Sequence, residues 1–317
     1  MSKYRGALPQ LQNELFLTDG GIETTLIFLE GLELPNFAAF HLLRTREGES
    51  ALRKYFRAYV AIALRFGTGP ILESATWRAN PDWAKKLGYS SAALAAANRK
   101  AIQLLEAIRA ESETRTAPFV ISGCVGPRGD GYVAEQMMTD GEATAYHAEQ
   151  IETFAGTAAD MVCAITMNYS GEAIGISRAA QNAGMPVAIS FTVETDGNLP
   201  TGQSLQAAVA EVDGATAGYP SYYMINCAHP THFEDVLGAG GSWLKRIKGL
   251  RANASRRSHA ELNDSDDLDI GDPRELGMQY AGLTKQLTQL NIMGGCCGTD
   301  HRHLEQIAAA CAPLFHA

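Results

Sequence analysis

Two adjacent cysteines between glycine pairs are the residues of this chain best suited to chemistry. The surrounding sequence reads Gly294-Gly295-Cys296-Cys297-Gly298-Thr299, and a third cysteine stands upstream in Asn226-Cys227-Ala228. Zinc prefers thiolate ligands, and three protein ligands leave a fourth position open for a reactant. The glycines would let the backbone approach a metal closely, where a Cβ atom would clash. The pattern predicts an open zinc site, although buried structural cysteines or a vicinal disulfide would give the same local sequence.

Length, composition and charge narrow the class of protein. The chain has 317 residues, of which 46% are hydrophobic, and this is enough for one large domain or two ordinary ones. A formal net charge of −9 argues against non-specific binding to nucleic acid or anionic membranes. The start of the chain is polar, and no apolar run reaches membrane length. We therefore expect a cytoplasmic protein with no nucleic-acid or membrane partner, whose six cysteines stay reduced.

Short apolar runs alternate with helical patterns along the chain. The runs predict strands at residues 15–18, 70–74, 118–122, 161–166, 187–193, 222–226, 243–249 and 290–293. A period of 3.6 residues predicts helices at 51–66, 92–110, 143–158, 172–183, 205–212, 275–289 and 303–312. Continuous apolar runs are typical of parallel strands that are buried on both faces. The alternation predicts a single-domain α/β fold, a (β/α)8 TIM barrel over residues 1–317.

A doubly wound open sheet is the alternative topology, but no Gly-x-Gly-x-x-Gly fingerprint follows the first run. The basic stretch at 245–257 is interpreted as a strand end followed by a solvated loop, because acidic residues follow it closely. The polar segment at 252–273 is expected to be a long loop after the seventh strand.

The strand ends show where chemistry is expected, because (β/α)8 barrels carry their active sites at the carboxyl ends of the strands. The candidate residues there are Asp19, Gly20, Glu73, Ser74, Thr76, Trp77, Thr166, Asn226, Cys227, Cys296 and Cys297. A closed barrel would bring Cys227 to the same rim as the adjacent cysteine pair. If the sixth and eighth strands lay in different layers, these cysteines would not lie together.

At these positions the chain resembles the homocysteine S-methyltransferase family, which includes betaine-dependent enzymes and the homocysteine-binding module of cobalamin-dependent methionine synthase. The resemblance covers nearly the whole chain and rests on four segments, Asp19-Gly20-Gly21, Val125-Gly126-Pro127, Asn226-Cys227 and the motif from Gly294 to Thr299. It implies a Zn²⁺ ion held by Cys227, Cys296 and Cys297. A small thiol would occupy the open position as its thiolate and receive a methyl group.

The resemblance also implies the reaction partners. Homocysteine is the leading acceptor, which would give methionine, and S-methylmethionine, S-adenosylmethionine, betaine or another methyl carrier is the donor. A homo-oligomer is compatible with the sequence. The alternatives are a different thiol or selenol acceptor, a zinc hydrolase or lyase, and a non-catalytic metal-binding paralogue. An all-thiolate site generates hydroxide poorly, which disfavours the hydrolase.

We expect the substrate to contact Asp19, Gly20, Glu73, Ser74, Thr76, Trp77, Thr166 and Asn226. Asp19 is also the candidate catalytic residue, because a carboxylate at a barrel mouth is costly to hold without a partner. Asp19 could instead cap the turn at Gly20, Glu73 could be a structural residue paired within the barrel, and Trp77 could pack on the rim.

The chain departs from the family at Ile165. Family members commonly have Glu-Thr where this chain has Ile165-Thr166, and that glutamate is associated with the amino group of homocysteine. Isoleucine cannot hold an amino group, so we expect the zinc chemistry to be kept while the substrate changes. Glu73 or Asp19 could supply a replacement carboxylate.

Other residues that could bind a metal are assigned structural positions. His229, His232, His301 and His303 follow the cysteines closely, but we place His232, His301 and His303 in first helical turns, with Asp300 as an N-cap. Cys163 and Cys311 are expected in the core.

Overall fold

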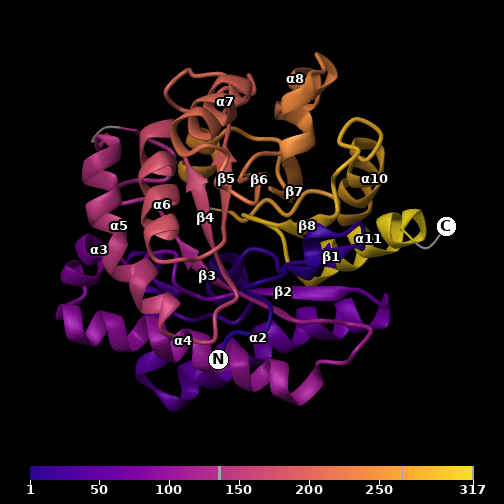
Figure 1. Ribbon diagram of the computed structural model, residues 1–317. Helices are drawn as coiled ribbons and strands as arrows, with labels where there is room; N and C mark the ends of the chain where they lie inside the picture. Colours follow the sequence, from indigo (N-terminus) through magenta and orange to yellow (C-terminus); the bar gives the residue numbers. More distant parts are fainter. Residues whose placement is uncertain (135–136, 266, 316–317) are drawn as a thin grey trace.

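Eight parallel strands form a closed barrel in the computed structural model, which describes residues 1–134, 137–265 and 267–315 (Figure 1). The strands are β1 (Phe16–Leu17), β2 (Gly69–Glu73), β3 (Val120–Val125), β4 (Met161–Met167), β5 (Val187–Thr192), β6 (Tyr222–Asn226), β7 (Ile247–Ala252) and β8 (Ile292–Gly295). Each strand pairs with the next in the chain, and β1 pairs with β8 through Phe16 opposite Ile292. The predicted (β/α)8 TIM barrel is confirmed, and the open sheet is excluded.

The helices surround the barrel (Figure 1). They are α1 (Ile22–Thr24), α2 (Arg46–Arg65), α3 (Pro81–Lys86), α4 (Ser91–Ser112), α5 (Asp140–Ala155), α6 (Ser170–Asn182), α7 (Leu205–Thr216), α8 (Glu234–Gly238), α9 (His259–Asn263), α10 (Pro273–Leu283) and α11 (His301–Cys311). Side-chain caps begin many of them, and Asp300 caps α11 as predicted, accepting from the backbone N–H of Arg302. None of the helices within the described residues combines the length and apolarity that a membrane crossing requires.

Two apolar layers hold the barrel together. Side chains that point into the barrel form the inner layer, which includes Phe16, Cys163 and Ile165. A larger outer layer lies between the strands and the helices and includes Cys311. Cys163 and Cys311 are fully buried, as expected of core residues.

The amino-terminal segment covers the amino ends of the strands. The backbone N–H groups of Lys3 and Tyr4 both donate to Asp160 Oδ1, at 2.7 Å each. Arg109 donates to the other oxygen of Asp160 at 2.8 Å. Leu8 packs into the inner apolar layer from this side. The segment therefore closes one end of the barrel and leaves the carboxyl ends of the strands for a site.

The seventh strand differs from its prediction. Residues 243–249 were expected to form it, but residues Ser242–Arg246 form a 3-10 helix and the strand runs from Ile247 to Ala252. The strand was placed too early because Lys248 and Arg251 interrupt its apolar pattern, although both are buried in it, at 8% and 6% exposed. The basic stretch at 245–257 contains the strand itself and a following loop in which Arg256 and Arg257 are exposed, and it also places Arg251 inside the barrel. The predicted loop that follows contains the short helix α9.

Candidate metal centre and active site

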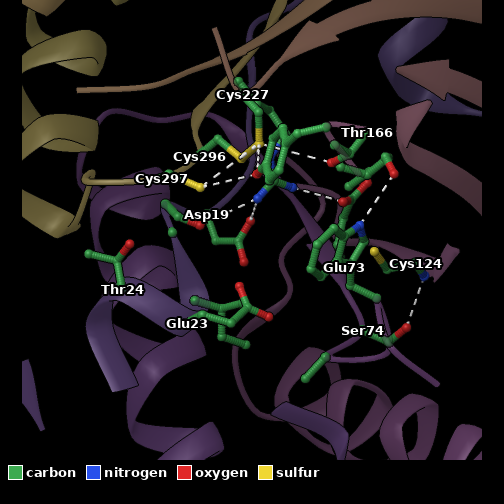
Figure 2. A pocket seen from close by; sticks show the side chains of 18 residues that line it. Asp19, Glu23, Thr24, Glu73, Ser74, Cys124, Thr166, Cys227, Cys296 and Cys297 are labelled. Carbon is green, nitrogen blue, oxygen red and sulfur yellow. Dashed lines mark hydrogen bonds and ion pairs between the residues drawn. A yellow bond between two sulfur atoms is a disulfide. The ribbon is translucent and has the colours of Figure 1, made fainter. Parts of the chain in front are cut away.

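The three predicted thiol ligands lie together at the carboxyl end of the barrel (Figure 2). Cys227 follows β6, and Cys296 and Cys297 follow β8. Their Sγ atoms all lie within 4.8 Å of one another, and those of Cys227 and Cys297 are 4.0 Å apart. Cys227 and Cys296 are joined as a disulfide, with their Cα atoms 5.4 Å apart, whereas the sequence led us to expect reduced cysteines. Closure of the barrel therefore brings together Cys227 and Cys296, which are 69 positions apart in the sequence.

The backbone at this rim adopts conformations that are rare for residues with side chains. Cys227 has a φ of 54° and Thr166 a φ of 66°, both in the left-handed region. Strand β7 holds the two cysteine segments, because Cys227 N donates to Arg251 O at 3.1 Å and Cys296 N donates to Ala252 O at 2.9 Å. Strained backbone that tertiary contacts hold in place is a common feature of functional sites.

Two of the glycines beside the cysteines are explained by the packing around them. A Cβ atom at Gly294 would collide with Thr18, and one at Gly295 would collide with Thr299. Thr299 in turn donates from Oγ1 to Cys296 O at 2.7 Å, which shapes the turn that carries the sulfurs. These two glycines thus make room for threonine side chains, whereas the sequence suggested that they make room for a metal.

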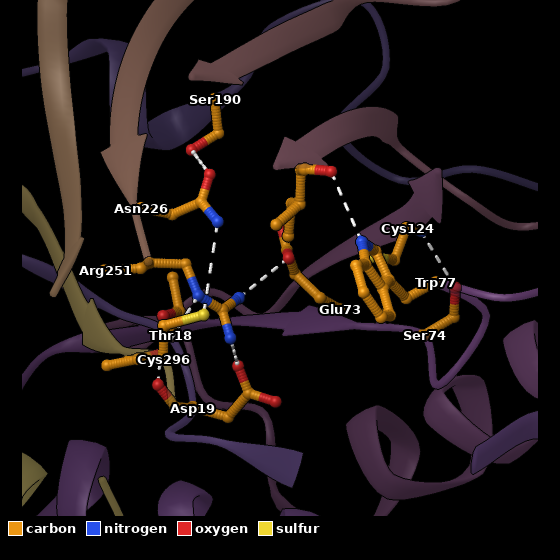
Figure 3. Close-up of polar contacts among 12 residues, drawn as sticks. Thr18, Asp19, Glu73, Ser74, Trp77, Cys124, Ser190, Asn226, Arg251 and Cys296 are labelled. Atoms are coloured by element: carbon orange, nitrogen blue, oxygen red, sulfur yellow. Dashed lines mark hydrogen bonds and ion pairs between the residues drawn. The ribbon is translucent and has the colours of Figure 1, made fainter. Parts of the chain in front are cut away.

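Asn226 connects three strands beneath the sulfurs (Figure 3). Its Oδ1 accepts from Ser190 Oγ at 2.6 Å and from Thr166 N at 3.0 Å. Its Nδ2 donates to Thr166 Oγ1 at 2.9 Å and lies 4.0 Å from Cys296 Sγ. Asn226 is fully buried, and these bonds stabilise the strained residue at the end of β4.

Arg251 lies between Asp19 and Glu73 (Figure 3). Its Nη2 donates to Asp19 Oδ1 at 2.5 Å, and its Nη1 donates to Glu73 Oε2 at 2.8 Å. Its Nε donates to Gly295 O at 3.2 Å, and Tyr55 OH donates to Asp19 Oδ2 at 2.9 Å. Burial raises the pKa of Glu73 to about 7, although Arg251 opposes the rise. Glu73 is therefore paired within the barrel, which agrees with the expectation that it could be a structural residue.

The sulfurs and the carboxylates face one cavity of about 90 Å³. Of the predicted substrate residues, those that line it are Asp19, Gly20, Glu73, Ser74, Trp77 and Thr166. Thr76 and Asn226 are not among its lining residues, as far as the chain is described. Thr76 Oγ1 instead donates to Cys124 O at 2.7 Å, which ties the end of β2 to β3. Trp77 Nε1 donates to Ile165 O at 3.3 Å, so the indole and Ile165 form an apolar wall.

The ionisable side chains at the site that were not anticipated from the sequence include Glu23, Tyr132, Arg251 and His259. Tyr132 OH lies 3.4 Å from Cys227 Sγ and 3.6 Å from Cys297 Sγ. His259 Nε2 contacts the carbonyl oxygen of Cys227, and its ring lies 4.3 Å from that of Tyr132. Tyr132 comes from the loop after β3, and His259 begins the short helix α9 after β7. Only the glycine-rich composition around Tyr132 could have indicated a loop near the site.

The histidines that follow the cysteines lie outside the sulfur group. Within the described residues, the group that could hold a metal ion contains Cys227, Cys296 and Cys297 and no histidine. His229 Nδ1 is bonded to Thr231 Oγ1 at 2.8 Å, and burial lowers the pKa of His229 to about 4. His232 ends the 3-10 helix Pro230–His232, and His303 Nε2 lies 2.8 Å from Ile270 O. These side chains hold loops near the site.

Residues 16–311 match the homocysteine S-methyltransferase family. The chain belongs to this family. The match confirms both the predicted family and the predicted enzyme class, that of the methyltransferases.

Two solved structures and one further protein resemble the chain. The homocysteine methyltransferase MmuM from Escherichia coli, in its metallated form, is 20% identical with a TM-score of 0.69, over 96% of this chain and 98% of that chain. The oxidised form of the same protein is 19% identical with a TM-score of 0.71, over 97% and 99% of the two chains. At these identities the likeness supports the fold. Methionine synthase from Mycobacterium leprae (strain TN) is 28% identical over 153 residues, which are 47% of this chain and only 12% of that protein.

The donor set of the sulfur group fits the metal that the family implies. Three cysteine sulfurs converge on one point, and no carboxylate or imidazole of the described residues joins them. Cys297 is exposed, so the group is open toward the solvent side. Soft thiolate donors favour a soft or borderline ion over Mg²⁺ or Ca²⁺. A metal at this place would have three protein ligands and an accessible face.

Proposed function

We propose that this member of the family is a zinc-dependent S-methyltransferase that transfers a methyl group to a small thiol. The observation that carries the proposal is the convergence of Cys227, Cys296 and Cys297 on a cavity at the carboxyl end of the barrel. Homocysteine is the leading acceptor, and methionine would be the product. The similarity to a homocysteine methyltransferase and to part of a methionine synthase supports this choice.

Cys227, Cys296 and Cys297 would hold the Zn²⁺ ion. When bound, zinc supplies Lewis acidity that lowers the pKa of a coordinated thiol, so that the acceptor is a thiolate at neutral pH. The hydroxyl of Tyr132, near two of the sulfurs, would donate to thiolates and moderate their negative charge.

The other residues of the cavity would bind and orient the acceptor. Trp77 and Ile165 offer an apolar wall for its carbon chain and exclude water from the sulfur. Asp19 lines the cavity, but both of its carboxylate oxygens already accept hydrogen bonds, from Arg251 and Tyr55. We therefore propose Asp19 as a positioning residue rather than a proton acceptor. Methyl transfer to a thiolate requires no further base, because the thiol proton has already been lost.

The methyl donor would enter from the open carboxyl end of the barrel, because the amino-terminal segment covers the opposite end. Attack in line on the methyl carbon needs donor and acceptor in one orientation, and the cavity walls would supply it. S-methylmethionine, S-adenosylmethionine and betaine remain the candidate donors.

The test is a titration of the reduced protein loaded with cobalt(II) in place of zinc. Small thiols should change the cobalt absorption spectrum, because they enter the coordination sphere, and thiols of similar size without that effect would be excluded as acceptors. Incubation with isotopically labelled methyl donors should then transfer label to the bound thiol. A spectrum that no thiol alters would indicate a saturated structural metal and would contradict the proposal.

A further inference from the structure

Glu23 supplies a carboxylate to the sulfur cavity from a position that the sequence did not single out. It lies in α1, directly after the segment from Asp19 to Gly21, and it lines the same cavity as Cys227 and Cys297. Figure 2 shows its carboxyl group directed toward Asp19 and the space beneath the sulfurs. Burial raises the pKa of Glu23 to about 7, and the charge of Asp19 adds to the rise.

The backbone holds Glu23 in a set position relative to the cysteines. On one side of it, Gly21 N donates to Thr299 O at 3.0 Å. On the other side, Thr24 Oγ1 accepts from Gly298 N at 3.1 Å. Both bonds reach the turn that follows the adjacent cysteines. The backbone on both sides of Glu23 is therefore tied to the turn that carries the sulfurs.

The charges of the cavity do not balance without a ligand. Arg251 is the single cation between two carboxylates, Asp19 and Glu73. Within the described residues, the Glu23 side chain forms no ion pair and no hydrogen bond to another residue. A partly buried carboxylate without a partner is costly, and a bound cation would remove that cost.

Arg78 carries the other positive charge that acts on Glu23, but it is engaged elsewhere. Its guanidinium lies over the rings of Trp77 and Trp83, at 4.1 Å and 3.8 Å from their centroids. It also donates to Gly129 O at 2.9 Å. Arg78 therefore stabilises the loop at the rim and leaves Glu23 unpaired.

We propose that Glu23 binds a positively charged group of the ligand that enters the sulfur cavity. The inference rests on the proposed function, and two sources of the charge fit it: the ammonium group of an amino-thiol acceptor, and the onium centre of a methyl donor. Ile165 brings no charge to the opposite wall, so Glu23 carries the recognition of the cation.

An onium donor fits the charge balance of the reaction. The acceptor sulfur forms a bond to the methyl carbon, the bond from that carbon to the onium atom breaks, and its electron pair stays on the onium atom. The anionic thiolate and the cationic donor become a neutral thioether and a neutral amine or thioether. The partner of Glu23 is thereby lost at the moment of transfer, which favours release of the spent donor.

The experiment compares charged ligands with uncharged analogues in Glu23→Gln and in the unaltered protein. The acceptor pair is homocysteine and 4-mercaptobutyrate, which lacks the amino group. The donor pair is betaine with 3,3-dimethylbutyrate, in which a neutral carbon replaces the quaternary nitrogen. Binding is measured by calorimetry on the reduced, zinc-loaded protein. Glu33→Gln is the matched control, because Glu33 is exposed and does not line the cavity.

Glu23→Gln should weaken the charged member of the acceptor pair or of the donor pair about ten- to a hundredfold, with the uncharged member little changed. The pair that responds identifies the source of the cation, and Glu33→Gln should change neither. If thiols bind at the metal but Glu23→Gln affects charged and uncharged ligands equally, or affects neither, the proposed role of Glu23 is wrong. If no thiol binds at the metal of the unaltered protein, the proposed function itself fails, and this inference fails with it.

Discussion

Arg251 on β7 donates from Nη2 to Asp19 Oδ1, just after β1, at 2.5 Å, and both side chains are buried. The same guanidinium reaches Glu73 on β2 and the carbonyl of Gly295 on β8. One side chain thus connects four strands directly beneath the sulfur group. Asp19 and Glu73, which were expected to contact the substrate, form ion pairs with Arg251.

Replacing Arg251 by methionine should lower the free energy of unfolding by about 3–5 kcal/mol, because it leaves Asp19 and Glu73 buried without a partner. Urea unfolding at neutral pH measures the change. Arg57→Met is the matched control, since Arg57 pairs with Glu111 on the surface, and it should cost no more than about 1 kcal/mol. Equal effects of the two substitutions would show that the buried pairs do not stabilise the barrel.

Serine at Cys227, Cys296 or Cys297 should abolish tight zinc binding, because a hydroxyl is a hard and largely protonated donor. The reduced, unaltered protein should hold about one zinc per chain. Metal analysis after dialysis measures both. Cys311→Ser, a buried cysteine of α11 far from the group, should keep its zinc. Full zinc content without Cys227 would show that the ligand set is wrong.

Mild peroxide should release the metal and join Cys227 to Cys296, the pair that forms the disulfide of the structure. Thiolates in an open site are the form that oxidants attack. Peptide mass spectrometry should find this crosslink with Cys297 still free, and reductant with zinc should restore metal binding. Retention of zinc with all three cysteines reduced would count against the prediction.

The stability of the metal-free, reduced protein should depend on pH through Glu23. Its pKa is about 7 in the folded protein, above the ordinary value of 4.5, so its contribution to stability is present below pH 4.5 and is lost as the pH rises through 7. Between pH 5 and pH 8, the free energy of unfolding of Glu23→Gln should therefore rise by about 1–3 kcal/mol relative to that of the unaltered protein. Unfolding in urea at these two pH values tests this, with Glu33→Gln showing no such gain.

Ile165→Glu should increase the preference for homocysteine over 4-mercaptobutyrate by about ten- to a hundredfold, because it adds a carboxylate to the apolar wall beside Trp77. Ile165→Gln is the control, since it is polar and similar in size but carries no charge. Competition binding to the metal-loaded protein measures the ratio. A glutamate with no more effect than glutamine would show that the amino group of the acceptor does not reach this wall.

Much of the fold and part of the site could be predicted from the sequence. Eight apolar runs separated by helical patterns are a regular signal, because parallel strands buried on both faces admit few polar residues. The cysteines were found because their types and spacing limit the chemistry they can do. Barrel closure then follows from strand order, and it explains why Cys227 meets the adjacent pair.

Only the tertiary structure decided which side chains surround the sulfurs. Arg251 was missed because a charged residue within a buried strand breaks the apolar pattern, and only Asp19 and Glu73 on distant strands make its burial tolerable. Tyr132 lies on a loop and His259 begins the short helix α9, and the positions of both depend on contacts made after the barrel closes. The sequence did not single out Glu23, and only the folded structure places it in the cavity. Pairing between residues far apart in the chain carries no local sequence signal, so the charge pattern of this site exists only in the folded protein.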